Sequence, residues 1–261
     1  GLDASFSRID RATFALLHAD GYRVFCQNYW TGLAAPAPRL ENLTDAIAEG
    51  FIPAIYLVVT TDGRGPVERA VADLTPYQNL WNSLAFVAID AEVPGTTLEA
   101  LMDAATFIKI LGQRPVLYTA RWFWLGHMDN TQILTDLPLW NAFYDGDPDL
   151  DFPHYPYGGW LDKDVMGEQY QGTTTVYGTA EVDLNIFDDA FILMQESAMP
   201  PEELARLEKI EAILAANDIT ADDRLSDSVR AIEVAIGDML RLAEGQSQAW
   251  AELKRQWFNE T

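Results

Sequence analysis

The stretch that decides the fold runs from residue 86 to residue 119 and reads "FVAIDAEVPGTTLEALMDAATFIKILGQRPVLYT". It begins within one β-type run, "LAFVAID" (84–90), and ends with another, "RPVLYT" (114–119). The segment between them opens with a threonine cap, continues as a helical pattern and ends at Gly112. A strand, a helix and a second strand in this order predict two neighbouring parallel strands.

The same alternation occurs elsewhere in the first 190 residues. Further helical patterns occupy 11–20 and 39–50, whereas "RWFWLGHM" (121–128) reads as a loop whose Trp122 and Trp124 pack against the core. Little helix separates the last three strands. We therefore predict an α/β fold, an irregular TIM-like barrel of eight strands and fewer helices. The remaining predicted strands are 1–5, 22–29, 52–59, 137–144, 165–172 and 181–187.

Composition excludes several classes of function. A net charge of −23 predicts no nucleic-acid partner and no adhesion to anionic membranes, because like charges repel. The sequence contains no run of eighteen apolar residues, so we expect no transmembrane span. The opening "GLDASFSRID" has neither a basic start nor an apolar core, so we expect no secretory signal there. The single Cys26 excludes an internal disulfide and reads as a buried, inert thiol.

Four carboxylates fall at predicted strand ends. Asp3 lies on the first strand, Asp90 ends the fourth and Glu92 comes two residues after it, and Asp183 lies on the eighth. The catalytic mouth of a parallel barrel is formed by the carboxyl ends of its strands, so we expect these acids to face one mouth. A lone aspartate there is usually a turn residue. Four acids together predict raised pKa values and the paired carboxylates of glycoside hydrolysis.

Aromatic residues occur near the same strand ends, where their flat faces suit the apolar faces of sugar rings. Each could equally be an ordinary core residue, but as a group they favour a glycan-binding groove. They are Tyr56, Tyr118, Trp140, Tyr144 and Tyr170.

The chain resembles the lysozymes of glycoside hydrolase family 25 over about residues 1–190. Five elements in order carry the resemblance: "GLDAS", "FVAIDAE", "GQRPVLYTARWFW", "LPLWNAFY" and "GEQYQGTTTVYGTAEVDLNIF". They are similar to the family's G-x-D-x-S opening, its strand ending in D-x-E, its G-x-x-P-x-x-Y-T…W element, its L-W-x-A-x-Y strand and its W-Q-Y…V-D-L-N-x-F region.

The resemblance implies cleavage of the β-1,4 bond between N-acetylmuramic acid and N-acetylglucosamine in peptidoglycan. Glu92 carries over as general acid. Asp90 carries over as the residue that orients or stabilises the substrate acetamido group, and Asp3 and Asp183 as residues that tune this pair and bind substrate. Gln169, in the "QY" element, joins the aromatic residues as a substrate contact. Internal attack by the acetamido carbonyl and direct attack by water both remain open.

The sequence departs from the family pattern at three places. Glu168 replaces the usual tryptophan before "QY", "NYWTG" replaces an acid-containing stretch, and "YLV" keeps Tyr56 but loses a histidine. These changes affect the groove more than the four acids. They leave a second hypothesis, a barrel that binds glycan without cutting it, such as a phage tail component.

The expected setting is extracellular or virion-associated action on the bacterial cell wall, typical of a phage endolysin. We expect no cofactor and no metal. The alternating aspartates of "YDGDPDLDF" (144–152) resemble the start of a calcium loop, but Leu150 and Pro156 occupy the positions that require glycine and glutamate.

After "MPPEE" (199–203) the pattern is helical throughout, so we predict a barrel domain at 1–198 and a helical extension at 199–261. In the extension an apolar stripe from Leu225 to Trp257 advances in alternating steps of four and three, the period of a coiled coil. A hairpin that folds back and self-association through residues 200–261 both fit this stripe, and its length favours self-association.

Overall fold

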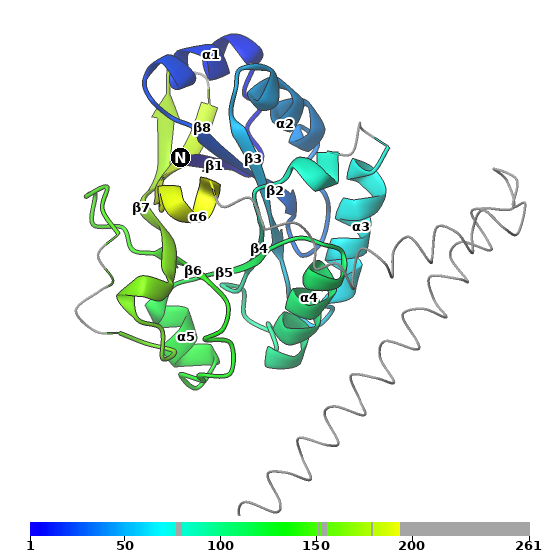
Figure 1. Cartoon of the computed structure of the whole chain (residues 1–261), viewed down its shortest axis with the longest axis vertical. Helices are drawn as coiled ribbons and strands as arrows, with labels where there is room; N and C mark the ends of the chain where they lie inside the picture. The colour runs from blue at the N-terminus through cyan, green and yellow to red at the C-terminus, as the bar shows by residue number, and fades with distance from the viewer. Residues whose placement is uncertain (77–79, 151, 153–155, 179, 194–261) are drawn as a thin grey trace, which may run out of the picture. The chain divides into compact units, whose positions relative to one another are not determined.

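The computed structural model describes residues 1–193, except 77–79, 151, 153–155 and 179. Its strands close into one barrel in sequence order (Figure 1). The strands are β1 (Leu2–Ala4), β2 (Val24–Trp30), β3 (Ile52–Val58), β4 (Val87–Asp90), β5 (Pro115–Thr119), β6 (Leu139–Ala142), β7 (Val165–Val176) and β8 (Ala180–Phe187). The predicted eight-stranded irregular barrel is confirmed.

The expectation that all strands run parallel is wrong for the last one. β1 to β7 pair in parallel, whereas β8 runs antiparallel to both β7 and β1. The reason lies in the connection from β7 to β8. Tyr177 and Gly178 follow β7 with φ of 49° and 67°, and a connection this short can join only antiparallel strands.

Helices cover the outside of the first half of the barrel (Figure 1). They are α1 (Arg11–Ala19), α2 (Arg39–Ala48), α3 (Arg64–Leu74) and α4 (Leu98–Ile110). The side chain of Asp10 caps α1 by accepting from the amide of Thr13, and Thr97 caps α4 by accepting from Ala100. α4 ends before Gly112, whose φ of 75° stops a helix at no steric cost.

Three of the α-helices in the described part of the chain were not predicted from the sequence. α3 begins with "RGP", and glycine and proline are typical of loops, so the sequence did not indicate a helix there. Proline is nevertheless tolerated in a first helical turn. The segment predicted as a loop after β5 is α5 (Arg121–His127). Its aromatic residues have only modest helix propensity, but Trp124 is fully buried against Trp160, at 4.9 Å between ring centroids, so tertiary packing stabilises the helix. Trp122, expected to pack, is 60% exposed. A short helix, α6 (Asp189–Leu193), follows β8.

The barrel interior is apolar, except at the mouth formed by the carboxyl ends of the parallel strands, where it is polar. A buried cluster that includes Cys26, Phe86, Trp140 and Phe187 fills it. Cys26 is buried and free, as predicted. None of the helices in the described part of the chain combines the length and apolar character needed to cross a membrane.

The barrel lies within a compact unit that spans Gly1–Met194. The predicted domain boundary near residue 198, the helical extension at 199–261 and its coiled-coil stripe lie outside the described residues.

Candidate active site

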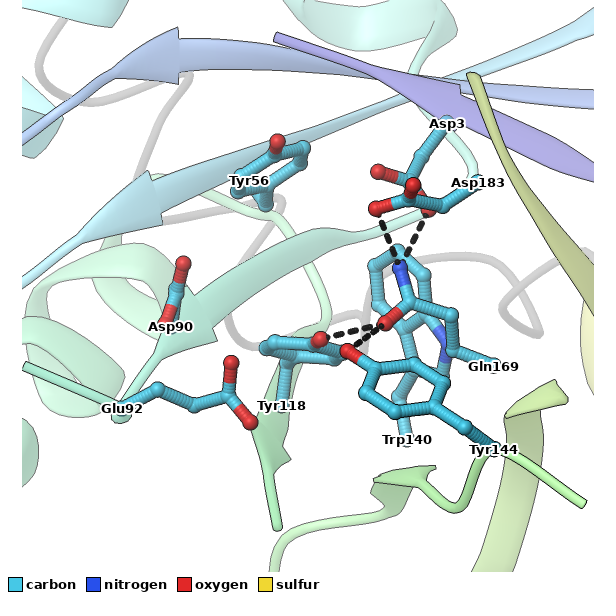
Figure 2. Close-up of a pocket in the computed structure, with 9 residues that line it drawn as sticks. All are labelled: Asp3, Tyr56, Asp90, Glu92, Tyr118, Trp140, Tyr144, Gln169 and Asp183. Carbon is cyan, nitrogen blue, oxygen red and sulfur yellow. Dashed lines mark hydrogen bonds between the residues drawn. The ribbon is translucent and has the colours of Figure 1, made fainter. Parts of the chain in front are cut away.

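One pocket opens at the carboxyl ends of the parallel strands, and all four predicted acids line it (Figure 2). The pocket takes one or more residues from most strands of the barrel. Its lining consists of Asp3, Tyr56, Asp90, Glu92, Tyr118, Trp140, Tyr144, Gln169 and Asp183.

The strand β4 supplies one pair of acids. Asp90 is the last residue of β4, and Glu92 follows two residues later, which directs both side chains toward the pocket. The backbone leading to Glu92 is held in place because Val59 donates to the carbonyl of Asp90 at 3.2 Å and Ala91 donates to the carbonyl of Tyr118 at 2.9 Å. The predicted orientation of this pair matches the structure.

The other pair comes from β1 and β8. Asp3 lies directly opposite Asp183 in the antiparallel ladder, so the two side chains are cross-strand neighbours on one face. The expectation that Asp183 faces this mouth was right, but the reason given for it was wrong. Because β8 runs antiparallel, the first half of β8, and not its end, reaches the mouth formed by the ends of the parallel strands.

A network of amide and hydroxyl groups links the Asp3–Asp183 pair to two tyrosines of the pocket. The amide nitrogen of Gln169 donates to Oδ2 of Asp3 at 2.9 Å and to Oδ2 of Asp183 at 3.0 Å. Its amide oxygen accepts from the hydroxyls of Tyr118 at 2.6 Å and Tyr144 at 2.7 Å. In Figure 2, Gln169 lies below the Asp3–Asp183 pair with Tyr118 and Tyr144 beside it, and the Asp90–Glu92 pair is on the left.

Two residues of this network were not singled out from the sequence. Asn185 donates to Oδ2 of Asp3 at 2.8 Å and accepts from the indole nitrogen of Trp140 at 3.0 Å. The hydroxyls of Ser5 and Tyr56 lie 2.6 Å apart. Asn185 and Ser5 are the two residues that were missed. They fall within stretches that carried the resemblance, two positions after Asp183 and Asp3 respectively. Residues two apart on a strand share a face, and this spacing could have identified them from the sequence.

The aromatic residues predicted to contact substrate lie at three kinds of position: in the wall of the pocket, in its floor and on the outside of the barrel. Tyr144 is 59% exposed and forms an accessible wall, whereas Trp140 is almost fully buried and forms the floor, with its ring centroid 4.8 Å from that of Tyr118. Tyr170 does not line the pocket. It follows Gln169 on β7, so the alternation of side chains directs it away from the barrel interior, toward Tyr22.

Burial dominates the electrostatics of the four acids. Burial raises the pKa of Asp3 to about 8, and the charge of Asp183 adds to the rise, while hydrogen bonds from Asn185 and Gln169 oppose it. Burial, followed by the charge of Glu92, raises the pKa of Asp90 well above its ordinary range. Burial also raises the pKa of Glu92, to about 7. The pKa of Asp183 is raised, chiefly by burial.

The pocket is therefore acidic, partly protonated near neutral pH and lined by no lysine, arginine or histidine of the described residues. One oxygen of Asp90, Oδ1, is buried and accepts no hydrogen bond within the described part of the chain. Nor do any three His, Cys, Asp or Glu side chains there form a group that could hold a metal ion. Such a site can donate a proton and accept hydrogen bonds from a neutral polar ligand.

Comparisons with known proteins agree with this geometry. The family model described as "Glycosyl hydrolases family 25" matches residues 31–178. Among curated proteins, counting factor 50 of Dictyostelium discoideum is 25% identical over 199 residues, which cover 69% of this chain and 62% of that protein. The chain thus spans less than two thirds of the length of this relative.

Several solved structures share the fold. The bacterial lysozyme from Streptomyces coelicolor superposes with a TM-score of 0.57 at 17% identity, over 72% of this chain and 91% of that one. The muramidase from Acremonium alcalophilum gives 0.55 at 19% identity, over 74% and 95%. The CTP1L endolysin gives 0.54 at 19% identity, over 73% and 67%.

Proposed function

Because the chain belongs to the glycosyl hydrolases of family 25, we propose that it is a peptidoglycan hydrolase that cleaves the β-1,4 bond between N-acetylmuramic acid and N-acetylglucosamine. The muramidases and lysozymes with the same fold support this substrate class. The observation that carries the proposal is the pocket in which Asp90 and Glu92 meet Asp3 and Asp183.

Glu92 is the proposed general acid. A general acid works best when its pKa lies near the working pH, and burial raises the pKa of Glu92 to about 7. Protonated Glu92 would pass its proton to the glycosidic oxygen as the bond from that oxygen to the sugar carbon breaks. The new bond to that carbon would come from water or, transiently, from the acetamido carbonyl of the substrate.

Asp90 is the proposed partner for the substrate acetamido group. Its Oδ1 is a buried acceptor that no described residue satisfies, and a buried acceptor gains most from a ligand that donates to it. A substrate N–H bonded there would also favour the ionised form of Asp90, whose pKa burial raises. The ionised carboxylate of Asp90 would then hold the acetamido group in place as positive charge develops on the sugar.

The pocket walls fit a sugar chain. Tyr144 presents an accessible aromatic face beside the acids, and the hydroxyls of Tyr56 and Tyr118 lie at the same mouth. Apolar and aromatic walls with a few placed polar groups are typical of small-molecule sites. The likeness to an endolysin supports action on the cell wall from outside the cell or from a virion, and a phage source is part of the proposal.

A turbidity assay on purified cell walls tests the proposal. The wild-type chain should clear the suspension and release new reducing ends, and Asp90→Asn should slow both at unchanged wall binding. Glu99→Gln, on the exterior helix α4, controls for the loss of one acid. Wall binding without any new reducing ends would refute the enzyme and support the non-catalytic glycan-binding barrel instead.

A further inference from the structure

The lining of the pocket offers a ligand many hydrogen-bond acceptors and almost no donors. Among the described residues it contains four carboxylic acids and no lysine, arginine or histidine. Its other polar groups are the amide of Gln169, the hydroxyls of three tyrosines and the indole nitrogen of Trp140. Anions bind to N–H and O–H donors, so the protons of these groups decide which ligands the pocket accepts.

The protein itself uses the protons around Gln169. The side chain of Gln169 donates its two amide protons to Asp3 at 2.9 Å and to Asp183 at 3.0 Å. The hydroxyls of Tyr118 and Tyr144 have one proton each, and both donate it to the oxygen of Gln169, at 2.6 Å and 2.7 Å (Figure 2). None of these protons remains for a ligand.

The other donors of the lining are also engaged. The indole nitrogen of Trp140 donates to Asn185 at 3.0 Å. The hydroxyls of Tyr56 and Ser5 lie 2.6 Å apart and share one hydrogen bond, so this pair keeps at most one proton for a ligand. By contrast, Oδ1 of Asp90 is a buried acceptor that receives no hydrogen bond within the described part of the chain. The pocket therefore suits a ligand that donates hydrogen bonds.

The charges of the acids disfavour an anion as well. The pocket volume is about 170 Å³, so a charge inside it lies close to all four carboxyl groups. The acids already repel one another: the charge of Asp183 adds to the raised pKa of Asp3, and the charge of Glu92 adds to that of Asp90. A ligand carboxylate would add to this repulsion, which water screens poorly in a buried site.

The arginines that follow β1, β2 and β3 in the chain supply no counter-charge, because each forms an ion pair with an aspartate of the protein. Arg121, which follows β5, also has an interaction partner of its own. The three ion pairs are Arg8 with Asp45, Arg39 with Asp73 and Arg64 with Asp103.

We propose that the pocket selects glycan without a free carboxylate beside the cut, so that muramic acid is accepted when its lactyl carboxyl is in amide linkage to a peptide and rejected when that carboxyl is free. This inference rests on the proposed function and specifies the form of its substrate. The amide is neutral, and its N–H can donate to the acceptors of the pocket. The carboxyl groups of the peptide itself lie further from the sugar ring.

The lactyl group comes close to the acids if the substrate binds as proposed. In muramic acid the acetamido group and the lactyl group are attached to adjacent ring carbons. A sugar whose acetamido N–H bonds to Oδ1 of Asp90 therefore brings its lactyl carboxyl to the same part of the mouth. The chain would act before any reaction that removes peptides from the glycan, since such amide hydrolysis exposes the free carboxylate.

Two tetrasaccharides that differ only in this group test the inference. Each alternates N-acetylglucosamine and N-acetylmuramic acid. The lactyl carboxyls are free in one, and in the other they are converted to carboxamides, which have a similar shape and no charge. Cleavage by the full chain at neutral pH is followed through new reducing ends. For one ionised carboxylate roughly 8 Å from the lactyl charge, partly screened at low salt, kcat/KM should be about tenfold higher for the carboxamide.

Salt and a variant identify charge as the cause of the preference. Raising the salt concentration from about 0.05 M to about 0.5 M should reduce the preference of the wild-type chain, because salt screens the repulsion. Asp183→Asn removes one carboxylate of the lining and should also reduce the preference, whatever its effect on the overall rate. Asp136→Asn is the control. Asp136 is exposed and precedes β6, at the opposite end of the barrel, so its loss should leave the preference unchanged.

Equal kcat/KM values for the two tetrasaccharides at low salt, or a higher value for the free acid, would overturn the inference. So would a preference that salt does not change, and this result needs no variant to fold. A chain that cuts neither tetrasaccharide and releases no reducing ends from cell walls would contradict the proposed function instead. Calorimetry with the same two tetrasaccharides then tests the charge preference by itself: tighter binding of the carboxamide supports it, and equal binding overturns it.

Discussion

Glu92→Gln should remove activity and, above neutral pH, stabilise the barrel. The substitution keeps the shape of the side chain and removes the acid. A positioned general acid typically contributes about 10²–10⁴-fold, so wall hydrolysis should fall by that factor. A variant that keeps more than about a tenth of the wild-type rate would contradict the assignment.

The gain in stability follows from the raised pKa. Burial raises the pKa of Glu92 to about 7 from an ordinary value of 4.5. Between these two values the folded protein holds a proton that the unfolded chain releases, so the free energy of unfolding falls as pH rises through this window. At 1.36 kcal/mol per pKa unit, ionised Glu92 costs the folded state about 3 kcal/mol at pH 8 and almost nothing at pH 4.

Urea unfolding followed by tryptophan fluorescence at pH 4 and pH 8 measures this cost. The difference in free energy of unfolding between Glu92→Gln and wild type should be about 3 kcal/mol larger at pH 8 than at pH 4. Glu181→Gln, at an exposed position of β8 outside the pocket, controls for the loss of one charge and should change little. Equal differences at the two pH values would refute the buried, protonated Glu92.

Three further changes test the rest of the account. Asp183→Asn should lower the pKa of Asp3 from about 8 in a carboxyl NMR titration, because the neighbouring charge is removed; an unchanged value would contradict the pairing across β1 and β8. Trp140→Phe deletes the indole hydrogen bond under the pocket and should cost about 1–3 kcal/mol of unfolding free energy in urea, and a loss no larger than that of exposed Trp122→Phe would contradict it. Truncation after Ser197 should abolish self-association in light scattering while hydrolysis continues; a full-length chain that is monomeric at micromolar concentration would refute the sequence-based prediction for residues 200–261.

The sequence predicts the structure well where elements that are consecutive in the chain also pair with each other in the barrel. The strand that ends in Asp90, the helix that ends before Gly112 and the next strand form one parallel unit, and the structure has it as predicted. The direction of β8 was missed because the pattern of a strand is the same in both directions. The short connection at Tyr177 and Gly178 contains the information that settles the direction.

The acids of the site could be found from sequence, but not their connections. Asp3, Asp90, Glu92 and Asp183 all lie near strand ends, and a barrel brings such positions together. The side chain of Gln169 bonds residues that are distant in the chain: Asp3 is 166 residues away and Tyr118 is 51 residues away. No local pattern encodes such a bond, since it depends on the tilt and register of the closed barrel.

If Glu92 promotes cleavage of the bond between N-acetylmuramic acid and N-acetylglucosamine, each cut leaves N-acetylmuramic acid at the new reducing end. Purified peptidoglycan is digested with the wild-type chain, reduced with borohydride and hydrolysed, and the reduced sugars are then identified by mass spectrometry. The reduced sugar should derive from N-acetylmuramic acid, and it should be absent after digestion with Glu92→Gln. A reduced sugar that derives from N-acetylglucosamine, or none at all with the wild-type chain, would contradict this cleavage by Glu92.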